Sequence, residues 1–278
     1  MDSTYRVAEF YDELGENEWE RLDADFLGRL EFEVTVDYLT AHLPEAGRVL
    51  DVGGGGGRYA VWLSNRGYDV DLVDVSRQQV SIARQKAREH TVDEHLAVTA
   101  GDVRQLPVEG PYDATLCLGG VLSHVLEAGE RTTAVQELQR VTNDGGPVFV
   151  SVMGLLASVT RMMRGAGTVA PEHDDTELLP DLVARGDYDR ELVAKYDREL
   201  AMQPMHLFRA DEFETLLEQG GLSVRTLAAL EGPASQRHNE QDVLTDSHKD
   251  TIRQTLQVLR EDRNVVDHSA HMLAVCRA

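Results

Sequence analysis

Residues 48–57 read RVLDVGGGGG, and this stretch decides the fold. Its first five residues have the apolar pattern of a short strand, and a helix is expected over about 58–66. Glycine lets the backbone adopt positive φ and pass close to a ligand, and the start of a helix offers free N–H groups. The stretch therefore predicts a nucleotide-binding turn. The alternative, a flexible surface turn, is disfavoured by the strand and the helix that flank the glycines.

The sequence on both sides of this turn alternates between strand and helix patterns. Ser76 can cap a helix that carries Val80, Ala83 and Ala87 on one face. This alternation predicts an α/β fold with a doubly wound, mostly parallel sheet and helices on both faces. Further helices are expected at about 130–142, 211–219 and 247–261, and strands at 69–75, 96–99, 113–118, 147–153, 222–229 and 271–276.

We expect one domain over residues 1–278. Residues 1–45 are predicted to form a helical N-terminal cap, 46–154 the nucleotide-binding core and 206–278 the C-terminal part of the sheet. Residues 155–205 show no strand signal and no core of their own, and they are strongly acidic after residue 172. We predict that they form a helical lid over the carboxyl ends of the strands, near Tyr11, Gly119 and His124. The alternative is a solvated excursion on the far side of the sheet.

The glycine spacing indicates which nucleotide is bound. The dinucleotide fingerprint needs G-x-G-x-x-G, but Arg58 stands at its third glycine, where it would hinder close packing of helix on strand. The spacing D-x-G-x-G-x-G fits instead, with Asp51, Gly53, Gly55 and Gly57. The stretch resembles the first motif of class I S-adenosylmethionine-dependent methyltransferases.

Three further segments resemble that family in order and spacing. The resemblance implies that Asp74 binds the ribose diol, that Asp102 meets the adenine amino group, and that Val103 packs on the adenine ring. It also implies a seven-stranded sheet whose last strand is antiparallel, S-adenosyl-L-methionine as the cofactor and S-adenosyl-L-homocysteine as its product. The remaining cofactor contacts expected from the resemblance are Val75, Leu118 and Gly119.

Candidate residues on the acceptor side rest on weaker patterns. Tyr11 resembles the tyrosine that small-molecule members place over the cofactor's methionine end, where an aromatic face suits a sulfonium; packing between helices is the alternative. His124 and His206 are the candidate general bases, with a structural role as the alternative for each. Trp19 and Arg21 are placed at the same cleft from their position on the N-terminal helix. We predict no metal site, because no His/Cys cluster has ligand spacing.

The amino-acid composition limits the kinds of partner that the protein can bind. The net charge is −22, and only three of the 27 basic residues are lysines. This balance argues against binding nucleic acid or an anionic membrane. It resembles the surface of proteins from salt-loving organisms, an acidic mesophilic protein being the alternative. A cytoplasmic location is the default, because no signal sequence or membrane-spanning run is found and Cys117 and Cys276 look like buried thiols.

These patterns predict methyl transfer from S-adenosylmethionine to a small-molecule acceptor. Leu118-Gly119-Gly120-Val121 lacks the N/D-P-P-Y/F motif of methyltransferases that act on amino groups of nucleic acid or protein. Two alternatives stay open: a non-catalytic regulatory protein that binds the cofactor or its product, and a nicotinamide-dependent oxidoreductase. The sequence does not identify the acceptor, the attacked atom or the oligomeric state.

Overall fold

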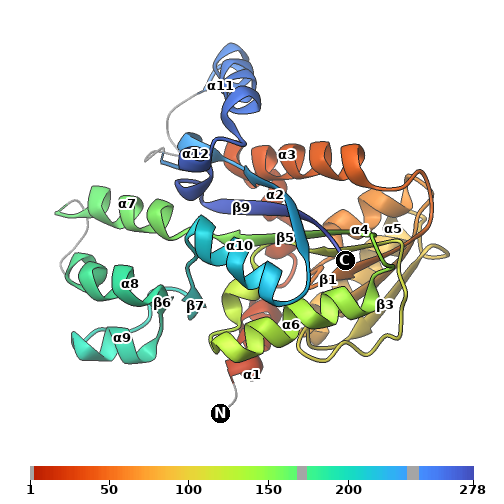
Figure 1. Cartoon of the computed structure of the whole chain (residues 1–278), viewed down its shortest axis with the longest axis horizontal. Helices are drawn as coiled ribbons and strands as arrows, with labels where there is room; N and C mark the ends of the chain where they lie inside the picture. The colour runs from red at the N-terminus through yellow and green to blue at the C-terminus, as the bar shows by residue number, and fades with distance from the viewer. Residues whose placement is uncertain (1–2, 168–173, 237–243) are drawn as a thin grey trace.

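The computed structural model describes residues 3–167, 174–236 and 244–278. A seven-stranded sheet runs through its centre in the order β3-β2-β1-β4-β5-β9-β8 (Figure 1). Strand β9 pairs antiparallel with both of its neighbours, and the other pairs are parallel. The predicted sheet with an antiparallel last strand is therefore confirmed. The strands are β1 Arg48–Val52, β2 Asp69–Asp74, β3 Leu96–Ala100, β4 Ala114–Cys117, β5 Pro147–Met153, β8 Ser223–Ala229 and β9 His271–Arg277.

Helices cover both faces of this sheet (Figure 1). One buried core contains side chains of α3, α4 and α5, and the other contains side chains of α6 and α10. The helices are α1 Ser3–Leu14, α2 Asn17–Ala24, α3 Phe26–His42, α4 Arg58–Ser64, α5 Arg77–Glu89, α6 Ala128–Val141, α7 Leu155–Gly165, α8 Leu179–Arg185, α9 Arg190–Lys195, α10 Ala210–Gln219, α11 Asp246–Leu259 and α12 Arg263–Asp267. The 3₁₀ turns are η1 Val121–His124, η3 Thr176–Leu178 and η4 Gly232–Gln236.

Strand β5 shows how the sequence builds the two cores. Successive strand residues point to opposite faces of a sheet. Phe149 accordingly packs in the core beneath α3, α4 and α5, whereas Val148 and Val150 pack in the core beneath α6 and α10. Because both faces are covered, β5 can be apolar along almost its whole length. Cys117 and Cys276 lie buried and unpaired, as predicted.

The sheet gathers one end of its parallel strands at a single edge. Strands β1, β2, β3, β4 and β5 run in the same direction, so their carboxyl ends meet there. The strand order reverses between β1 and β4, since the chain moves outward to β3 on one side and to β5 on the other. Open α/β sheets bind ligands at this switch point.

The N-terminal helices pack beside that edge. Helix α1 is held on α5 because the Gln79 side-chain amide donates to the carbonyls of Tyr11 and Gly15, at 2.8 and 2.9 Å. The Ser76 hydroxyl also bonds Asp12, at 2.5 Å. The predicted helical cap is broken at Gly15, which has positive φ, and at Asp25, whose side chain caps α3.

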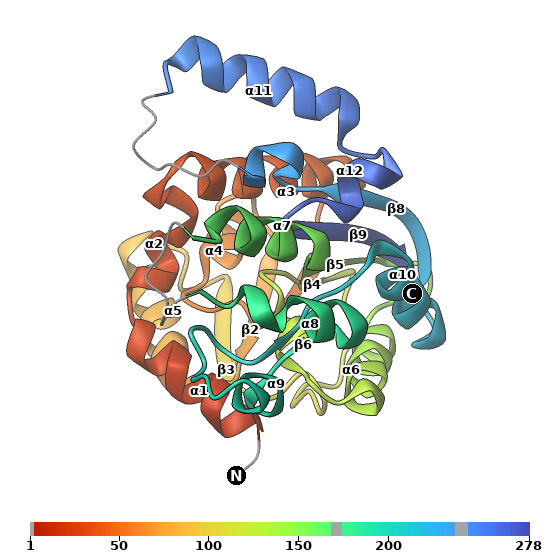
Figure 2. The same cartoon turned by 90° about the vertical axis from the view of Figure 1, so that its left-hand side faces the viewer.

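The segment 155–205, called the insertion below, differs from the sequence prediction in two ways. Strand β6 (Asp187–Tyr188) pairs with β7 (Met205–His206), although no strand signal was found there. Leu178, Leu182 and Leu192 are fully buried in a small core, although no core was expected. Figure 2 shows α7, α8 and α9 in front of the strand ends. Among the described residues, no helix has the length and apolarity to cross a membrane.

Candidate functional site

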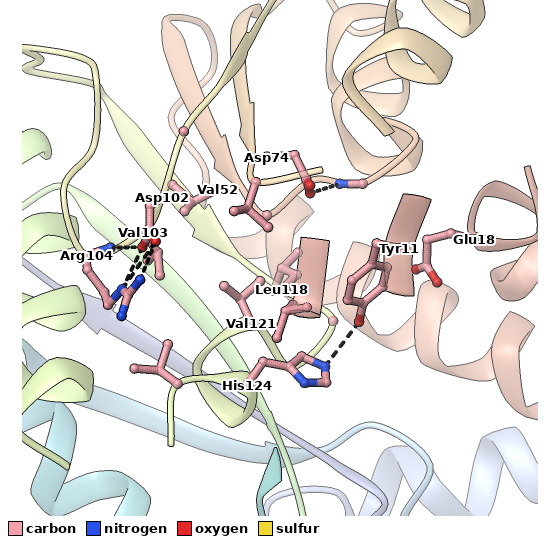
Figure 3. Close-up of a pocket in the computed structure, with 17 residues that line it drawn as sticks. Tyr11, Glu18, Val52, Asp74, Asp102, Val103, Arg104, Leu118, Val121 and His124 are labelled. Atoms are coloured by element: carbon pink, nitrogen blue, oxygen red, sulfur yellow. Dashed lines mark hydrogen bonds and ion pairs between the residues drawn. The ribbon is translucent and has the colours of Figure 1, made fainter. Parts of the chain in front are cut away.

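A cavity opens at the carboxyl ends of β1, β2 and β4 (Figure 3), and we call it the strand-end cavity. It brings together many of the residues selected from the sequence: Tyr11, Gly53, Gly55, Asp74, Val75, Asp102, Val103, Leu118, Gly119 and His124. Its lining also includes residues that are not predicted from the sequence: Val7, Glu18, Val52, Gly101, Arg104, Val121 and Val125.

The glycine turn forms the floor of this cavity, and the glycines serve different purposes. Gly53 has φ +68°, and a Cβ there would lie 2.2 Å from a methyl carbon of Val121. Gly55 has φ +53° and directs its N–H to Asp74, at 2.8 Å. Gly57 does not line the cavity. A Cβ on Gly57 would stand 3.3 Å from the Cβ of Ala83, so this glycine lets the start of α4 approach α5.

Asp74 lies at the end of β2 and faces the cavity. One carboxylate oxygen accepts from the Gly55 N–H and the other from the Ser76 N–H, both at 2.8 Å. These two bonds fix the orientation of the carboxylate and leave it lone pairs for a ligand. Burial raises the pKa of Asp74 to about 6, although the two backbone bonds act in the opposite direction.

Asp51 lies beneath the glycine turn rather than in the strand-end cavity. It borders a smaller hollow together with Trp19 and Arg21, two residues that the sequence predicts at the cleft. Its side chain is buried, and Oδ2 has no hydrogen-bond partner among the described residues. Burial and the neighbouring Asp74 raise the pKa of Asp51 to about 7. An unpartnered buried oxygen favours a hydrogen-bond donor from a ligand at this point.

Asp102 is already engaged by an arginine. Arg104 contacts Asp102 Oδ2 through Nη2 at 2.7 Å and donates its backbone N–H to Oδ1 at 2.9 Å. The same guanidinium reaches Glu130 at 2.6 Å. The sequence shows Arg104 two residues after Asp102, but nothing in it indicates that the side chain folds back. A ligand that hydrogen-bonds Asp102 therefore shares this carboxylate with Arg104.

Tyr11 and His124 point toward each other in the lining of the cavity (Figure 3). The Tyr11 hydroxyl lies 3.1 Å from His124 Nε2, and His124 Nδ1 lies 3.3 Å from the carbonyl oxygen of Pro204. A carbonyl only accepts, so this network assigns the proton to Nδ1, and the Tyr11 hydroxyl donates to Nε2. Burial lowers the pKa of His124, which keeps the imidazole neutral and its Nε2 unprotonated.

His206, the second candidate base, lies outside the cavities described here. Its Nδ1 stands 2.7 Å from Asp187 and its Nε2 stands 2.7 Å from Glu212, so both ring nitrogens are occupied. Burial alone would lower its pKa, but these two hydrogen bonds raise it. A charged imidazolium between two carboxylates ties the β6–β7 pair to α10. The structure places His206 in this linking position, outside the strand-end cavity that His124 lines.

A second cavity of about 340 Å³ adjoins the first, and we call it the insertion cavity. Tyr11, Glu18 and Gly119 border both cavities, so the two meet at these residues. The volume lies in the range of small-molecule sites. The other lining residues come mainly from the insertion and from the start of β9: Phe10, Leu14, Arg21, Met153, Ala157, Ser158, Arg161, Met202, Met205, Ser235, Ala270 and His271.

A buried network of charges lies behind this second cavity. Arg21 donates to both oxygens of Glu31, at 2.7 and 3.2 Å, and to Glu18 at 3.1 Å. His271 Nδ1 lies 2.5 Å from Glu231 and 3.8 Å from Glu31. Burial alone would lower the pKa of His271, but Glu31 and Glu231 raise it to about 9.

The same network has the ligand types of a metal centre. Oxygen and nitrogen atoms of Glu31, Glu231 and His271 lie within 4.8 Å of one another. However, both oxygens of Glu31 accept from Arg21, and a cation would have to displace that guanidinium. Ion pairing therefore accounts for the cluster.

Comparisons with known proteins agree with this geometry. Residues 49–146 match a family described as a methyltransferase domain. A ubiquinone biosynthesis O-methyltransferase of Xanthomonas oryzae pv. oryzae (strain PXO99A) is 31% identical over 121 residues, which are 43% of this chain and 49% of that protein. A glycine/sarcosine N-methyltransferase of Parasynechococcus marenigrum (strain WH8102) is 30% identical over 175 residues, which are 58% of this chain and 60% of that protein. The chain thus spans between about half and three fifths of these two curated relatives.

A solved structure extends the comparison to most of the chain. A SAM-dependent methyltransferase from Methanosarcina mazei superposes with a TM-score of 0.58 at 15% identity, covering 86% of this chain and 96% of that one. At this identity the likeness shows the fold. Residues 49–146 are therefore a methyltransferase domain, and the chain has the fold of the class I S-adenosylmethionine-dependent methyltransferases.

Proposed function

We propose that this protein transfers a methyl group from S-adenosylmethionine, held in the strand-end cavity, to a small molecule in the insertion cavity. The observation that carries the proposal is the meeting of the two cavities at Tyr11, Glu18 and Gly119, at the switch point of a class I sheet. Donor and acceptor held on either side of this junction would be in contact. Positioning of this kind can contribute about 7–11 kcal/mol to lowering the barrier.

The residues of the strand-end cavity fit the cofactor. Gly53 and Gly55 have positive φ, which lets the backbone of the turn line the cavity without a side chain, and Asp74 presents an oriented carboxylate to a ribose diol. In the smaller hollow beneath the glycine turn, Asp51 Oδ2 has no partner among the described residues and can accept from the ammonium of the methionine end. Val103 and Leu118 supply apolar walls. Bound there, S-adenosylmethionine supplies a methyl group that its sulfonium already makes electrophilic.

Tyr11 and His124 are the residues we assign to proton removal from the acceptor. The Tyr11 proton is engaged with His124 Nε2, so the Tyr11 oxygen keeps lone pairs for a hydroxyl or amine of the acceptor. The acceptor proton can pass to the Tyr11 oxygen while the Tyr11 proton passes to Nε2. His124 ends as an imidazolium that still donates from Nδ1 to Pro204. This relay serves acceptors that must lose a proton as the new bond forms.

The insertion is proposed to act as the cover of the acceptor site. Met202, Met205 and Ala157 line the second cavity, and methionine suits an adaptable apolar wall. Its own core lets the segment hold its shape at the sheet edge. A cover that excludes water strengthens the electrostatic interactions inside the site.

The proposal also includes where the protein works, which is a cytoplasm with a high salt concentration. A charge of −22 supports a protein of a salt-rich cytoplasm, where dissolved ions screen its self-repulsion. That charge also argues against a nucleic-acid substrate.

A non-catalytic protein that binds the same cofactor is the second candidate, because fold alone does not establish activity. Calorimetry with S-adenosylhomocysteine and NAD tests the ligand class, and we expect micromolar-range binding of the first only. Transfer of a labelled methyl group to a panel of small hydroxy and amino compounds then tests catalysis. Tight NAD binding without S-adenosylhomocysteine binding would refute both candidates, whereas cofactor binding without transfer to any compound would favour the second.

A further inference from the structure

One arginine of the insertion cavity takes no part in the chemistry described above. Arg161 lies on α7 one turn after Ala157, and both residues line the cavity. In the described ranges 3–167, 174–236 and 244–278, the exposed side chain of Arg161 has no carboxylate within 4 Å and makes no hydrogen bond, although the chain holds 49 acidic residues.

The other cations of this cavity are neutralised. Arg21 pairs with Glu18 and Glu31, at 3.1 and 2.7 Å. His271 pairs with Glu231 through Nδ1. Arg161 is thus the cation of the cavity wall whose counter-charge is missing from the described residues. A guanidinium beside apolar surface favours an anion with two oxygens, because it can donate to both.

We propose that the methyl acceptor is a small organic acid, which has an apolar body and ends in a carboxylate, and that Arg161 binds this carboxylate. This inference rests on the proposed function. Met153, Met202 and Met205 provide apolar surface for the body. His271 offers a second donor, since Glu231 occupies its Nδ1 and its Nε2 has no partner among the described residues.

The placement of charge also orients such an acceptor. Glu18 lies where the two cavities meet, and Arg21 is already paired with it and with Glu31, so this junction offers no free cation to an acid group. The acid group therefore lies away from this junction, toward Arg161. The nucleophilic end is then left beside Tyr11, where the proposed transfer takes place.

Pairs of ligands that have nearly the same shape but differ in charge can test the role of the carboxylate. Phenylacetate, 3-phenylpropanoate and octanoate are each titrated calorimetrically beside their primary amides, with and without bound S-adenosylhomocysteine, at one fixed salt concentration. We expect at least one acid to bind about ten- to a hundredfold more tightly than its amide, as for a lost hydrogen bond to a charged group. Arg161→Gln should remove this difference, and Arg161→Lys should restore part of it. Arg88→Gln is the matched control, because Arg88 is an exposed arginine of α5 that lines neither cavity.

Two results would overturn the organic-acid proposal. One is that no acid binds more tightly than its amide. The other is that Arg161→Gln and Arg88→Gln have the same effect. A wild-type protein that fails to bind S-adenosylhomocysteine would count against the proposed function instead, and the titrations without that ligand would still decide the role of Arg161.

Discussion

At the scale of single residues, Asp74 links the fold to ligand affinity through its charge. Burial raises its pKa to about 6, so the carboxyl group is mostly neutral at pH 5 and mostly ionised at pH 7. The ionised form accepts hydrogen bonds from a ribose diol, and the protonated form loses acceptor capacity. We therefore expect the affinity for S-adenosylhomocysteine to rise about tenfold between pH 5 and pH 7, measured by calorimetry.

Asp74→Asn tests the assignment of this dependence to Asp74. The variant should bind S-adenosylhomocysteine about ten- to a hundredfold more weakly at pH 7, because a charged acceptor is lost. Its remaining affinity should vary less with pH, although Asp51 also titrates near this range. Asp93→Asn, at an exposed surface position, serves as the control. Unchanged affinity in a folded Asp74→Asn protein would exclude the ribose contact.

The bond between Tyr11 and His124 makes a second prediction at this scale. Tyr11→Phe and His124→Asn should each lower kcat about 10²–10⁴-fold for acceptors that must lose a proton. If the two act as one relay, the double variant should be little slower than either single variant. Steady-state kinetics gives the rates, and calorimetry should show S-adenosylhomocysteine binding largely kept. If the fold-losses in kcat of the two single variants multiply in the double variant, a shared proton path is contradicted.

At the scale of elements, the insertion should open as a unit. Leu182 is fully buried in its small core, whereas the next residue, Val183, is 48% exposed. Leu182→Ala should destabilise this core by about 2–5 kcal/mol, and Val183→Ala should change little. Hydrogen exchange is expected to show faster exchange within the described parts of 155–205 and normal protection in β1 and β4.

The same pair of variants tests whether the insertion covers the acceptor site. Methyl transfer should fall in Leu182→Ala, while the Kd of S-adenosylhomocysteine stays near the wild-type value. A variant with a loosened insertion and full transfer activity would show that the segment does not shape the acceptor site.

The strands of the sheet were predictable because each carries its own signal. RVLDV and PVFVSVM are short segments of five and seven residues that are rich in apolar residues, so local sequence alone indicates burial. The β6–β7 pair was not predictable in this way. Each strand has two residues, too short for any periodicity, and the pairing joins Tyr188 to Met205 across a long connection.

Side-chain partners were the least predictable part of the site. Asp74 and the glycines follow from motif spacing, but the contact of Arg104 with Asp102 depends on a side-chain rotamer. Glu18 lies one turn before Arg21 on α2, and only the docking of that helix brings it to the junction of the two cavities. His206 illustrates the converse, because the sequence does not show that two carboxylates occupy its ring.

At the scale of the whole molecule, charge should govern stability. With a net charge of −22 the folded chain repels itself. The Debye length falls from about 10 Å at 0.1 M salt to about 3 Å at 1 M, which removes most of the repulsion between separated charges. We expect the Tm to rise between 0.1 and 2 M KCl, measured by calorimetry. A Tm that stays flat or falls would contradict the proposed adaptation to high salt.

The attachment of α1 to α5 has a consequence for which step limits the rate of turnover. Val7 and Tyr11 of α1 border the strand-end cavity, and Gln79 anchors the carboxyl end of this helix through two carbonyls. If the product leaves the strand-end cavity past Tyr11, its release would require those two hydrogen bonds to break. Release of S-adenosylhomocysteine, rather than methyl transfer, would then limit kcat, as in other enzymes in which product release is the slow step. Rapid-mixing kinetics should accordingly show a fast first turnover followed by a slower steady-state rate. Gln79→Ala should reduce the difference between these two rates.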